Sequence, residues 1–293
     1  MLSRLLFRGK LYLRSLKQQY HLMDKPIYQR ISHFEGLNGL RFIAAFLVVM
    51  HHSETIRKKY GLLHLEDFTL FRNGFNAVSF FFVLSGFLIT YLLLKERKQT
   101  SSISIRHFYV RRILRIWPLY FLLVIIGTLL VPILIHAVGY NYQFPYTFGQ
   151  VWFYFLFFMP FMVNILFGHH IIEPLWSIGV EELFYMFWAP FSKYTQNKYL
   201  IFIFAVIVVK VVLSILCLTI LKENIVLCRC VSMLQFEAMA IGALGAYWVF
   251  NRTEEISGNF LFSKPFQILV LAMLIAKLGF NSFLSTNSFT MVV

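Results

Sequence analysis

The chain is a series of long apolar runs separated by short polar links. Each run continues for about 20 residues, the length that an α-helix needs to cross a bilayer, and none alternates like the strands of a membrane β-barrel. We therefore expect an all-α, polytopic transmembrane helical bundle with about eight spans. The expected spans are residues 38–54, 74–94, 116–136, 148–167, 175–191, 199–221, 231–250 and 265–280.

The composition also indicates a membrane protein. Hydrophobic residues make up 59% of the 293 residues and charged residues only 14%, whereas soluble chains carry about 25% charged residues. The net charge of +14 comes from Lys and Arg beside apolar runs, where they mark cytoplasmic loops and suit anionic lipid or phosphate. We expect a bilayer as partner and no nucleic acid. The three cysteines form no CxxC pair, so no metal or redox site is expected.

The basic segments predict the orientation of the chain. Residues 1–36 are basic and lack the apolar core of a signal peptide, so we expect a cytoplasmic N-terminal arm followed by a transmembrane domain at 37–293. The link between the second and third runs is the most basic in the chain, whereas residues 136–147 contain no Lys, Arg, Asp or Glu. Basic loops stay in the cytoplasm, so the arm and the basic link are expected there.

The first run carries two polar side chains on one helical face. Arg41 and His52 are eleven residues apart, which brings them to within roughly 20° of the same face with a rise of about 16 Å. His51 lies roughly 80° away from that face. One stripe thus carries a guanidinium near the cytoplasmic end and an imidazole three turns deeper. An Arg that anchors the helix and a His at its far end would give the same spacing.

The fifth run contains carboxylates in an apolar setting. Ser177, Glu181 and Tyr185 follow i, i+4, i+8 spacing and share one helical face, whereas Glu182 lies off it. A charged group inside a membrane costs several kcal/mol unless it has a partner, so it is a candidate functional residue. A structural ion pair between Glu181 and an arginine is the alternative.

Two further features admit both a structural and a functional interpretation. Ser85 and Gly86 lie in the middle of the second run, where small residues give either a helix-packing notch or room for a thin ligand. Arg112 and Arg115 are three residues apart and share a helical face. Their guanidiniums suit phosphate, but the preference of basic residues for the cytoplasmic side explains them equally.

Two patterns indicate structure rather than chemistry. Ala238, Gly242 and Ala246 recur at four-residue spacing in the seventh run, which predicts a close-packed helix face. His169 and His170 lie in a short link without a Cys or carboxylate at the spacing of a metal site, so no metal is expected there.

Four motifs, taken in order, resemble those of the membrane-bound acyltransferase-3 family, which O-acylates bacterial surface and secreted carbohydrates. The resemblance covers the chain from about Gly36 onward, although Ile178-Gly179 replaces the commoner Leu-Ser pair. Family members usually have ten or so spans, so this chain is expected to be short at its C-terminus. The motifs are Arg41-x10-His52, Phe81 to Phe87, Arg112-x-x-Arg115 leading into Pro118-Leu119-Tyr120, and Trp176 to Tyr185.

The resemblance implies a multi-pass O-acyltransferase of the bacterial cytoplasmic (inner) membrane. The donor would be a cytoplasmic acyl-CoA, usually acetyl-CoA, and the acceptor a hydroxyl of a carbohydrate or glycolipid that is exported or displayed on the surface. His52 would act as general base, Glu181 would orient its imidazole, and Arg41 would hold the donor or stabilise the oxyanion. Arg112 and Arg115 would bind the phosphates of CoA. The pantetheine arm would pass Ser85 and Gly86, with Trp176, Ser177 and Tyr185 in support.

Two alternatives remain open from the sequence. A proton-coupled transporter also uses Arg, His and Glu inside the membrane, although the chain shows no inverted repeat of the kind that many transporters contain. A truncated, inactive member of the family is the other alternative. The residues do not select the acceptor or the acyl group.

Overall fold

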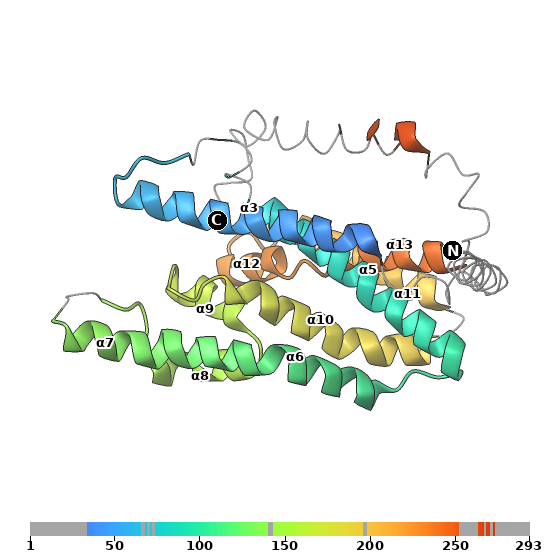
Figure 1. Cartoon of the computed structure of the whole chain (residues 1–293), viewed down its shortest axis with the longest axis horizontal. Helices are drawn as coiled ribbons and strands as arrows, with labels where there is room; N and C mark the ends of the chain where they lie inside the picture. The colour runs from blue at the N-terminus through green and yellow to red at the C-terminus, as the bar shows by residue number, and fades with distance from the viewer. Residues whose placement is uncertain are drawn as a thin grey trace, which may run out of the picture.

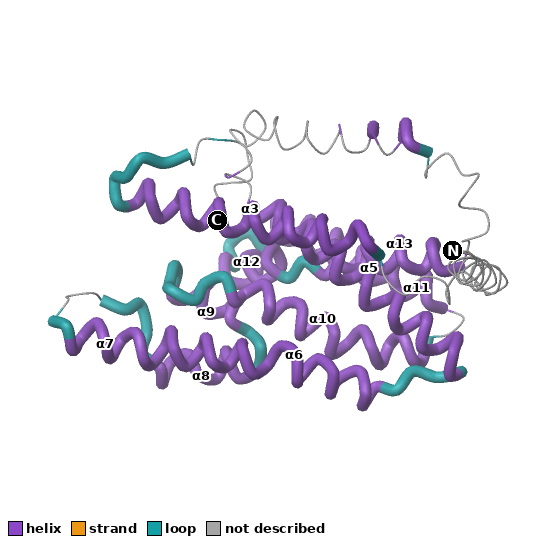
Figure 2. The backbone as a smooth tube through the Cα atoms, viewed as in Figure 1, coloured by secondary structure: helices purple, strands orange, loops and turns teal. Residues whose placement is uncertain are grey.

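The computed structural model describes residues 34–65, 68, 71, 74–139, 143–195, 198–251, 263–266, 268–269 and 272. In this part of the chain every regular element is a helix (Figure 1, Figure 2), which confirms the all-α expectation. The expected N-terminal arm and the expected eighth span lie almost entirely outside the described residues. The elements are α3 (Glu35–Lys59), α5 (Gly74–Thr100), α6 (Ile105–Ile125), the π-helical turn η1 (Ile126–Leu130), α7 (Val131–Ala137), α8 (Phe148–Leu156), α9 (Pro160–Phe167), α10 (Leu175–Tyr194), α11 (Tyr199–Thr219), α12 (Ile225–Met233) and α13 (Phe236–Asn251).

Several helices are long enough to cross a membrane. Within the described residues, four segments are both long and apolar enough: Gly74–Thr100, Ile105–Ala137, Tyr199–Thr219 and Ile225–Asn251. The second joins α6, η1 and α7, and the fourth contains α12 and α13. Helices α3 and α10 have 25 and 20 residues, so each is about 30 Å long or more. The chain is therefore a multi-pass membrane protein.

The expectation of a single span at 148–167 is wrong. The chain forms the short helices α8 and α9 instead, with Phe158 at a φ of 55° in the break and Pro160 as the first residue of α9. Proline lacks the N–H that a continuing helix needs but fits the first turn of a new one. At 9 and 8 residues, neither helix reaches the length of a span.

The expected span at 231–250 is also interrupted, between α12 and α13. Lys210 of α11 donates hydrogen bonds to the carbonyl oxygens of Val231 and of Leu234, the latter at 2.7 Å, and forms an ion pair with Glu237 at 3.2 Å. A helix break within a membrane frees backbone carbonyls that must find partners inside the protein. The ammonium group of Lys210 satisfies two of them, so Glu237 serves this break rather than a ligand cavity.

Helices α5 and α13 pack backbone to backbone. A Cβ atom at Gly86 would overlap the carbonyl of Met239, and one at Gly242 would overlap the carbonyl of Val83. This contact agrees with the close-packed face predicted for α13. Of the two interpretations of Gly86, the geometry supports the packing notch, because the backbone of α13 fills the space beside it.

We expect Gly86→Ala to destabilise the protein. The added methyl group forces α5 and α13 apart, and overpacking of this kind lowers the free energy of unfolding by about 1–3 kcal/mol. Gly39→Ala in α3 is the matched control, because nothing lies within 4 Å of its Cβ position, so alanine there should be neutral or stabilising. Thermal unfolding of the detergent-solubilised variants measures the difference. Equal stability of the two variants would contradict the α5–α13 contact.

Candidate active site

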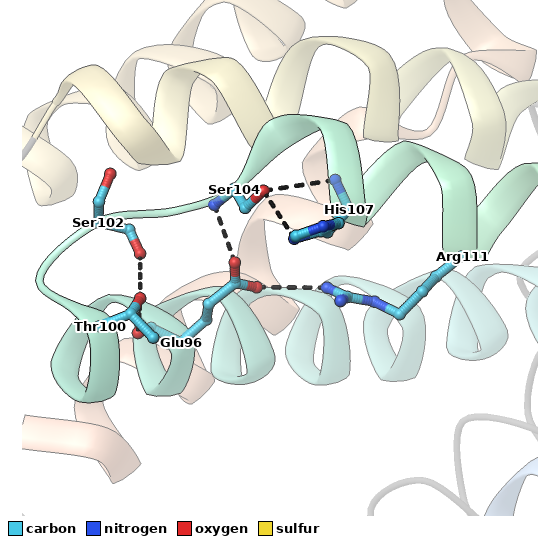
Figure 3. A network of polar contacts seen from close by, with 6 residues as sticks. All are labelled: Glu96, Thr100, Ser102, Ser104, His107 and Arg111. Carbon is cyan, nitrogen blue, oxygen red and sulfur yellow. Dashed lines mark hydrogen bonds and ion pairs between the residues drawn. The ribbon is translucent and has the colours of Figure 1, made fainter.

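The basic link between α5 and α6 is held together by Glu96 (Figure 3). Its carboxylate accepts hydrogen bonds from the backbone N–H of Ser104 at 2.8 Å and from the guanidinium of Arg111 at 3.3 Å. The hydroxyl of Ser104 in turn accepts from the N–H of His107 and caps α6. These contacts fix the rotation of α6, so that Arg111 reaches α5 while Arg112, about 100° further round the helix, faces the bundle.

Glu181 of α10 is the centre of a polar cluster inside the apolar bundle. One carboxylate oxygen accepts a hydrogen bond from the hydroxyl of Ser85 on α5 at 2.8 Å, and the other accepts from the hydroxyl of Tyr185 at 3.2 Å. Ser85 and Tyr185 are buried, whereas Glu181 keeps a partly accessible surface. The carboxylate is therefore held by hydroxyl groups from two helices.

Two guanidiniums from different helices act on this carboxylate. Arg41 of α3 and Arg112 of α6 are the positive charges that interact with Glu181. The Cζ atom of Arg112 lies 4.6 Å from the centroid of the Tyr185 ring, within the range of a cation–π interaction. The Nε of Arg41 is buried without a hydrogen-bond partner among the described residues. Glu181 thus supplies negative charge to both guanidiniums, and Arg112 also interacts with the charge of Glu182.

Glu182 lies on a different face of α10 from Glu181, as its helical position predicts, and contacts α6. It accepts a hydrogen bond from the indole N–H of Trp117 on α6 at 3.1 Å, and the charge of Arg112 acts on it. Its second oxygen is buried and has no hydrogen-bond partner in the part of the chain that the structure describes. The spacing of the sequence placed Glu182 off the polar stripe but did not indicate its partner.

The remaining predicted site residues take different positions. Trp176 is buried and stacks on Phe75 at 6.1 Å between ring centroids, so it forms an aromatic wall. The hydroxyl of Ser177 donates to the carbonyl of Pro174 at the start of α10 rather than to Glu181. Arg115 is exposed, whereas Arg112 is half-buried.

Within the described residues no hydrogen bond or ion pair joins His52 to Glu181, whose partners are Ser85 and Tyr185. The charged and titratable groups that act on His52 are Glu173, His51 and His169, and its ring lies 5.4 Å from that of His51. Glu173, in the link between α9 and α10, is the residue that our interpretation of the sequence missed. It follows His169 by four residues, and that spacing was a signal that the two side chains could meet.

Within the described residues no group of three or more His, Cys, Asp or Glu side chains is placed to hold a metal ion. The polar cluster around Glu181 consists of carboxylate, guanidinium and hydroxyl groups. Such groups bind anions, polarise carbonyls and transfer protons.

Comparison with known proteins decides the family. A family model described as an acyltransferase domain matches residues 34–293. The chain belongs to the acyltransferase-3 family. The matched range contains every residue of the polar cluster around Glu181, together with His52 and Glu173, so the cluster lies in the acyltransferase domain.

Curated relatives of this acyltransferase-3 chain are bacterial proteins named as O-acetyltransferases. A Staphylococcus aureus (strain COL) protein named "Putative O-acetyltransferase" is 31% identical over 173 residues, which cover 55% of this chain and 25% of the relative. "Peptidoglycan O-acetyltransferase OatA" of Listeria monocytogenes is 24% identical over 180 residues, covering 57% of this chain and 26% of the relative. The chain thus matches about a quarter of the length of these relatives. No solved structure matches it.

Proposed function

We propose that this chain is the membrane acyltransferase part of a bacterial O-acetyltransferase. It would move an acetyl group from acetyl-CoA, bound at the basic cytoplasmic face, to a hydroxyl of an exported or surface carbohydrate. The protein would lie in the cytoplasmic membrane with its N-terminus in the cytoplasm, as the basic segments indicate. A peptidoglycan or related glycan is the acceptor class suggested by the relative in Listeria.

One observation carries the proposal. Residues from all four motifs interact with the carboxylate of Glu181 on α10. Ser85 of α5 and Tyr185 of α10 donate hydrogen bonds to it, and the charges of Arg41 on α3 and Arg112 on α6 act on it. Membrane proteins do not assemble two guanidiniums and a carboxylate in an apolar bundle without a task, because each charge costs several kcal/mol there unless partnered. Anion binding next to a partly open carboxylate suits a donor that carries phosphates and a thioester.

The chemistry divides between the two ends of α3. His52 would take the proton from the acceptor hydroxyl as its oxygen attacks the thioester carbonyl, and the same imidazole would return the proton to the departing CoA thiolate. The C–O bond forms, the C–S bond breaks, and the products are the O-acyl ester and CoA thiol. Arg41 would hold the acyl-CoA donor at the other end of the helix, while Glu181 holds Arg41 and Arg112 in place. We favour direct transfer over an acyl-His intermediate.

Arg115 is expected to contact the CoA phosphates, because its guanidinium is exposed whereas Arg112 is engaged with Tyr185. Arg115→Ala should weaken binding of radiolabelled acetyl-CoA about tenfold or more, the magnitude of one charge-assisted hydrogen bond. Arg111→Ala on the same helix is the matched control, since Arg111 is paired with Glu96. Binding to protein in lipid nanodiscs measures both, and unaltered affinity of Arg115→Ala would contradict this role.

Release of CoA thiol tests the function as a whole. Purified protein given acetyl-CoA and a glycan acceptor should release CoA thiol and acetylate the acceptor. Mass spectrometry of surface glycans should show the same acetyl group in cells that carry the gene and its loss in cells that lack it. A proton-coupled carrier would instead move its solute without consuming acetyl-CoA. Solute flux without any thiol release would overturn the proposal.

A further inference from the structure

The turn that joins α11 and α12 brings two cysteines together, and the proposed function uses neither of them. The thiol of Cys228 on α12 donates hydrogen bonds to the carbonyl oxygens of Leu221 at 3.3 Å and of Cys217 on α11 at 3.7 Å. The thiol of Cys217 is in hydrogen-bonding contact with that of Cys228, and both are free thiols. A disulfide requires two cysteine side chains that face each other across a few ångströms, and this pair meets that requirement.

The third cysteine, Cys230, lies on the far face of α12 from Cys228. Two residues along an α-helix turn a side chain by about 200°, and the thiol of Cys230 contacts Sδ of Met162 on α9 at 3.3 Å. The three cysteines therefore divide into a facing pair and a single thiol. No cysteine motif announces this division, because Cys217 and Cys228 are eleven residues apart and belong to different helices.

Helix α12 depends on α11 for its position. It has 9 residues, fewer than an isolated helix needs to be stable. Lys210 of α11 bonds the carbonyls of Val231 and Leu234 at the C-terminal end of α12. Cys217 lies seven residues further along α11, a rise of about 10 Å, and contacts the first half of α12 through Cys228. A covalent bond at this second point would fix α12 together with the helix break that Lys210 satisfies.

The path of the chain places the cysteine pair at the end of the bundle away from the basic α5–α6 link. Tyr109, near the start of α6, donates to the carbonyl of Met186 in the second half of α10 at 2.6 Å, and Ser192 of α10 bonds to Tyr199, the first residue of α11, at 3.0 Å. Helix α11 therefore starts at the end that carries the basic link. Its 21 residues rise by about 30 Å, so Cys217 in its last turn lies at the opposite end, where Figure 1 also shows α12.

We propose that Cys217 and Cys228 form a disulfide that staples α12 to α11 on the outer side of the membrane, where disulfides form and persist. The thiolate of Cys217, which is the more accessible of the two, attacks a small-molecule disulfide and releases one thiol. The thiolate of Cys228 then attacks the sulfur of Cys217 and releases the second thiol. The S–S bond of the oxidant breaks, a new S–S bond forms, and the two protons pass to the released thiols. The inference shares its orientation with the proposed function but none of its chemistry.

Oxidation of the full chain in nanodiscs by oxidised glutathione tests the pairing. In the folded protein Cys217 should join Cys228 about tenfold or more in preference to Cys230, because disulfide formation depends on geometry. In sodium dodecyl sulfate, which unfolds the chain, Cys217 should join the two about equally, since the two loops have nearly the same length. Equal joining in the folded protein would overturn the pairing. Mass spectrometry identifies the links, because trypsin places the three cysteines on the separate peptides 211–222, 223–229 and 230–252.

The staple should also be visible in stability. Oxidised wild-type protein should unfold about 5 °C or more above the reduced protein, because the bond closes a loop in the unfolded chain. Cys217→Ser and Cys228→Ser should each remove this shift, whereas Cys230→Ser is the matched control and should keep it. The comparison of the two wild-type states does not depend on how the variants fold. Identical unfolding temperatures of those states, with the link formed, would overturn the role as a staple.

Trapping in cells separates this inference from the proposed function. Intact cells grown in air are treated with N-ethylmaleimide to block free thiols, and the peptides of Cys217 and Cys228 should then be found joined. A link that forms in purified protein but is missing in cells would overturn the disulfide as a feature of the cell. A joined pair in a protein that releases no CoA from acetyl-CoA would support the disulfide and overturn the function. Acyl transfer by a protein whose pair does not join would leave the function intact and overturn the disulfide.

Discussion

His52→Ala should abolish acyl transfer while the protein still inserts and remains soluble in detergent. Loss of a general base removes about 10²–10⁴-fold of rate, and the ring of His52 is only partly buried at the outer part of α3, so its removal leaves little empty space in the bundle. Release of CoA thiol and acetylation of the acceptor measure the loss. Normal acetylation by this variant in cells would remove His52 from the mechanism.

His51→Ala is the control for that result. The ring of His51 is bound to the Phe71 carbonyl and packed against Gly74, so its loss should loosen the contact between α3 and α5 and lower thermal stability. Its effect on the rate at a temperature where the variant is folded should be much smaller than that of His52→Ala. Equal loss from both would contradict the assignment of separate tasks to the two imidazoles.

Glu181→Gln should have the largest effect on stability. The substitution keeps the shape of the side chain but leaves Arg41 and Arg112 without the carboxylate that stabilises them. The two arginines lose compensating charge in an apolar setting, and an unsatisfied buried polar group costs about 1–3 kcal/mol, with more for a charged one. We expect a lower unfolding temperature in nanodiscs, together with loss of acyl transfer because Arg41 is no longer held.

Ser85→Ala and Tyr185→Phe calibrate that prediction. Each removes one hydrogen bond to Glu181, which is worth about 1 kcal/mol. In a double-mutant cycle each should be strongly non-additive with Glu181→Gln, because the hydroxyl and the carboxylate are direct partners. Additive effects would show that Glu181 does not depend on these hydroxyls, and unchanged stability of Glu181→Gln would contradict the role of its charge.

The helices and their rough positions followed from the sequence because a membrane leaves few alternatives. A continuous apolar run must satisfy its backbone groups internally, and a helix does so without help from the rest of the chain. The expected span at 148–167, which was wrong, shows the limit of counting apolar residues. Pro160 was visible in the sequence and signals a new helix start, but the apolar residues on both sides outweighed it in our prediction.

Within the candidate site, the predictions that held were local ones. Helical spacing placed Tyr185 one turn from Glu181, and the two side chains are bonded. The same spacing favoured Ser177, which bonds to Pro174 instead, because a hydroxyl near a helix start can bond a nearby carbonyl of its own chain. His169 and Glu173 are also one turn apart, and their pairing could have been predicted in the same way.

The sequence by itself determined the helical membrane class, the family motifs and the contact between Glu181 and Tyr185, since these depend on patterns along the chain or on spacing within one helix. Only the tertiary structure decided that Ser85 and two arginines converge on Glu181, that α13 fills the space at Gly86, and that His51 bonds to the carbonyl of Phe71. The physical reason is that these partners come from different parts of the chain. Their meeting depends on how each helix is rotated and how deeply it sits, which packing between helices sets and spacing along one chain does not.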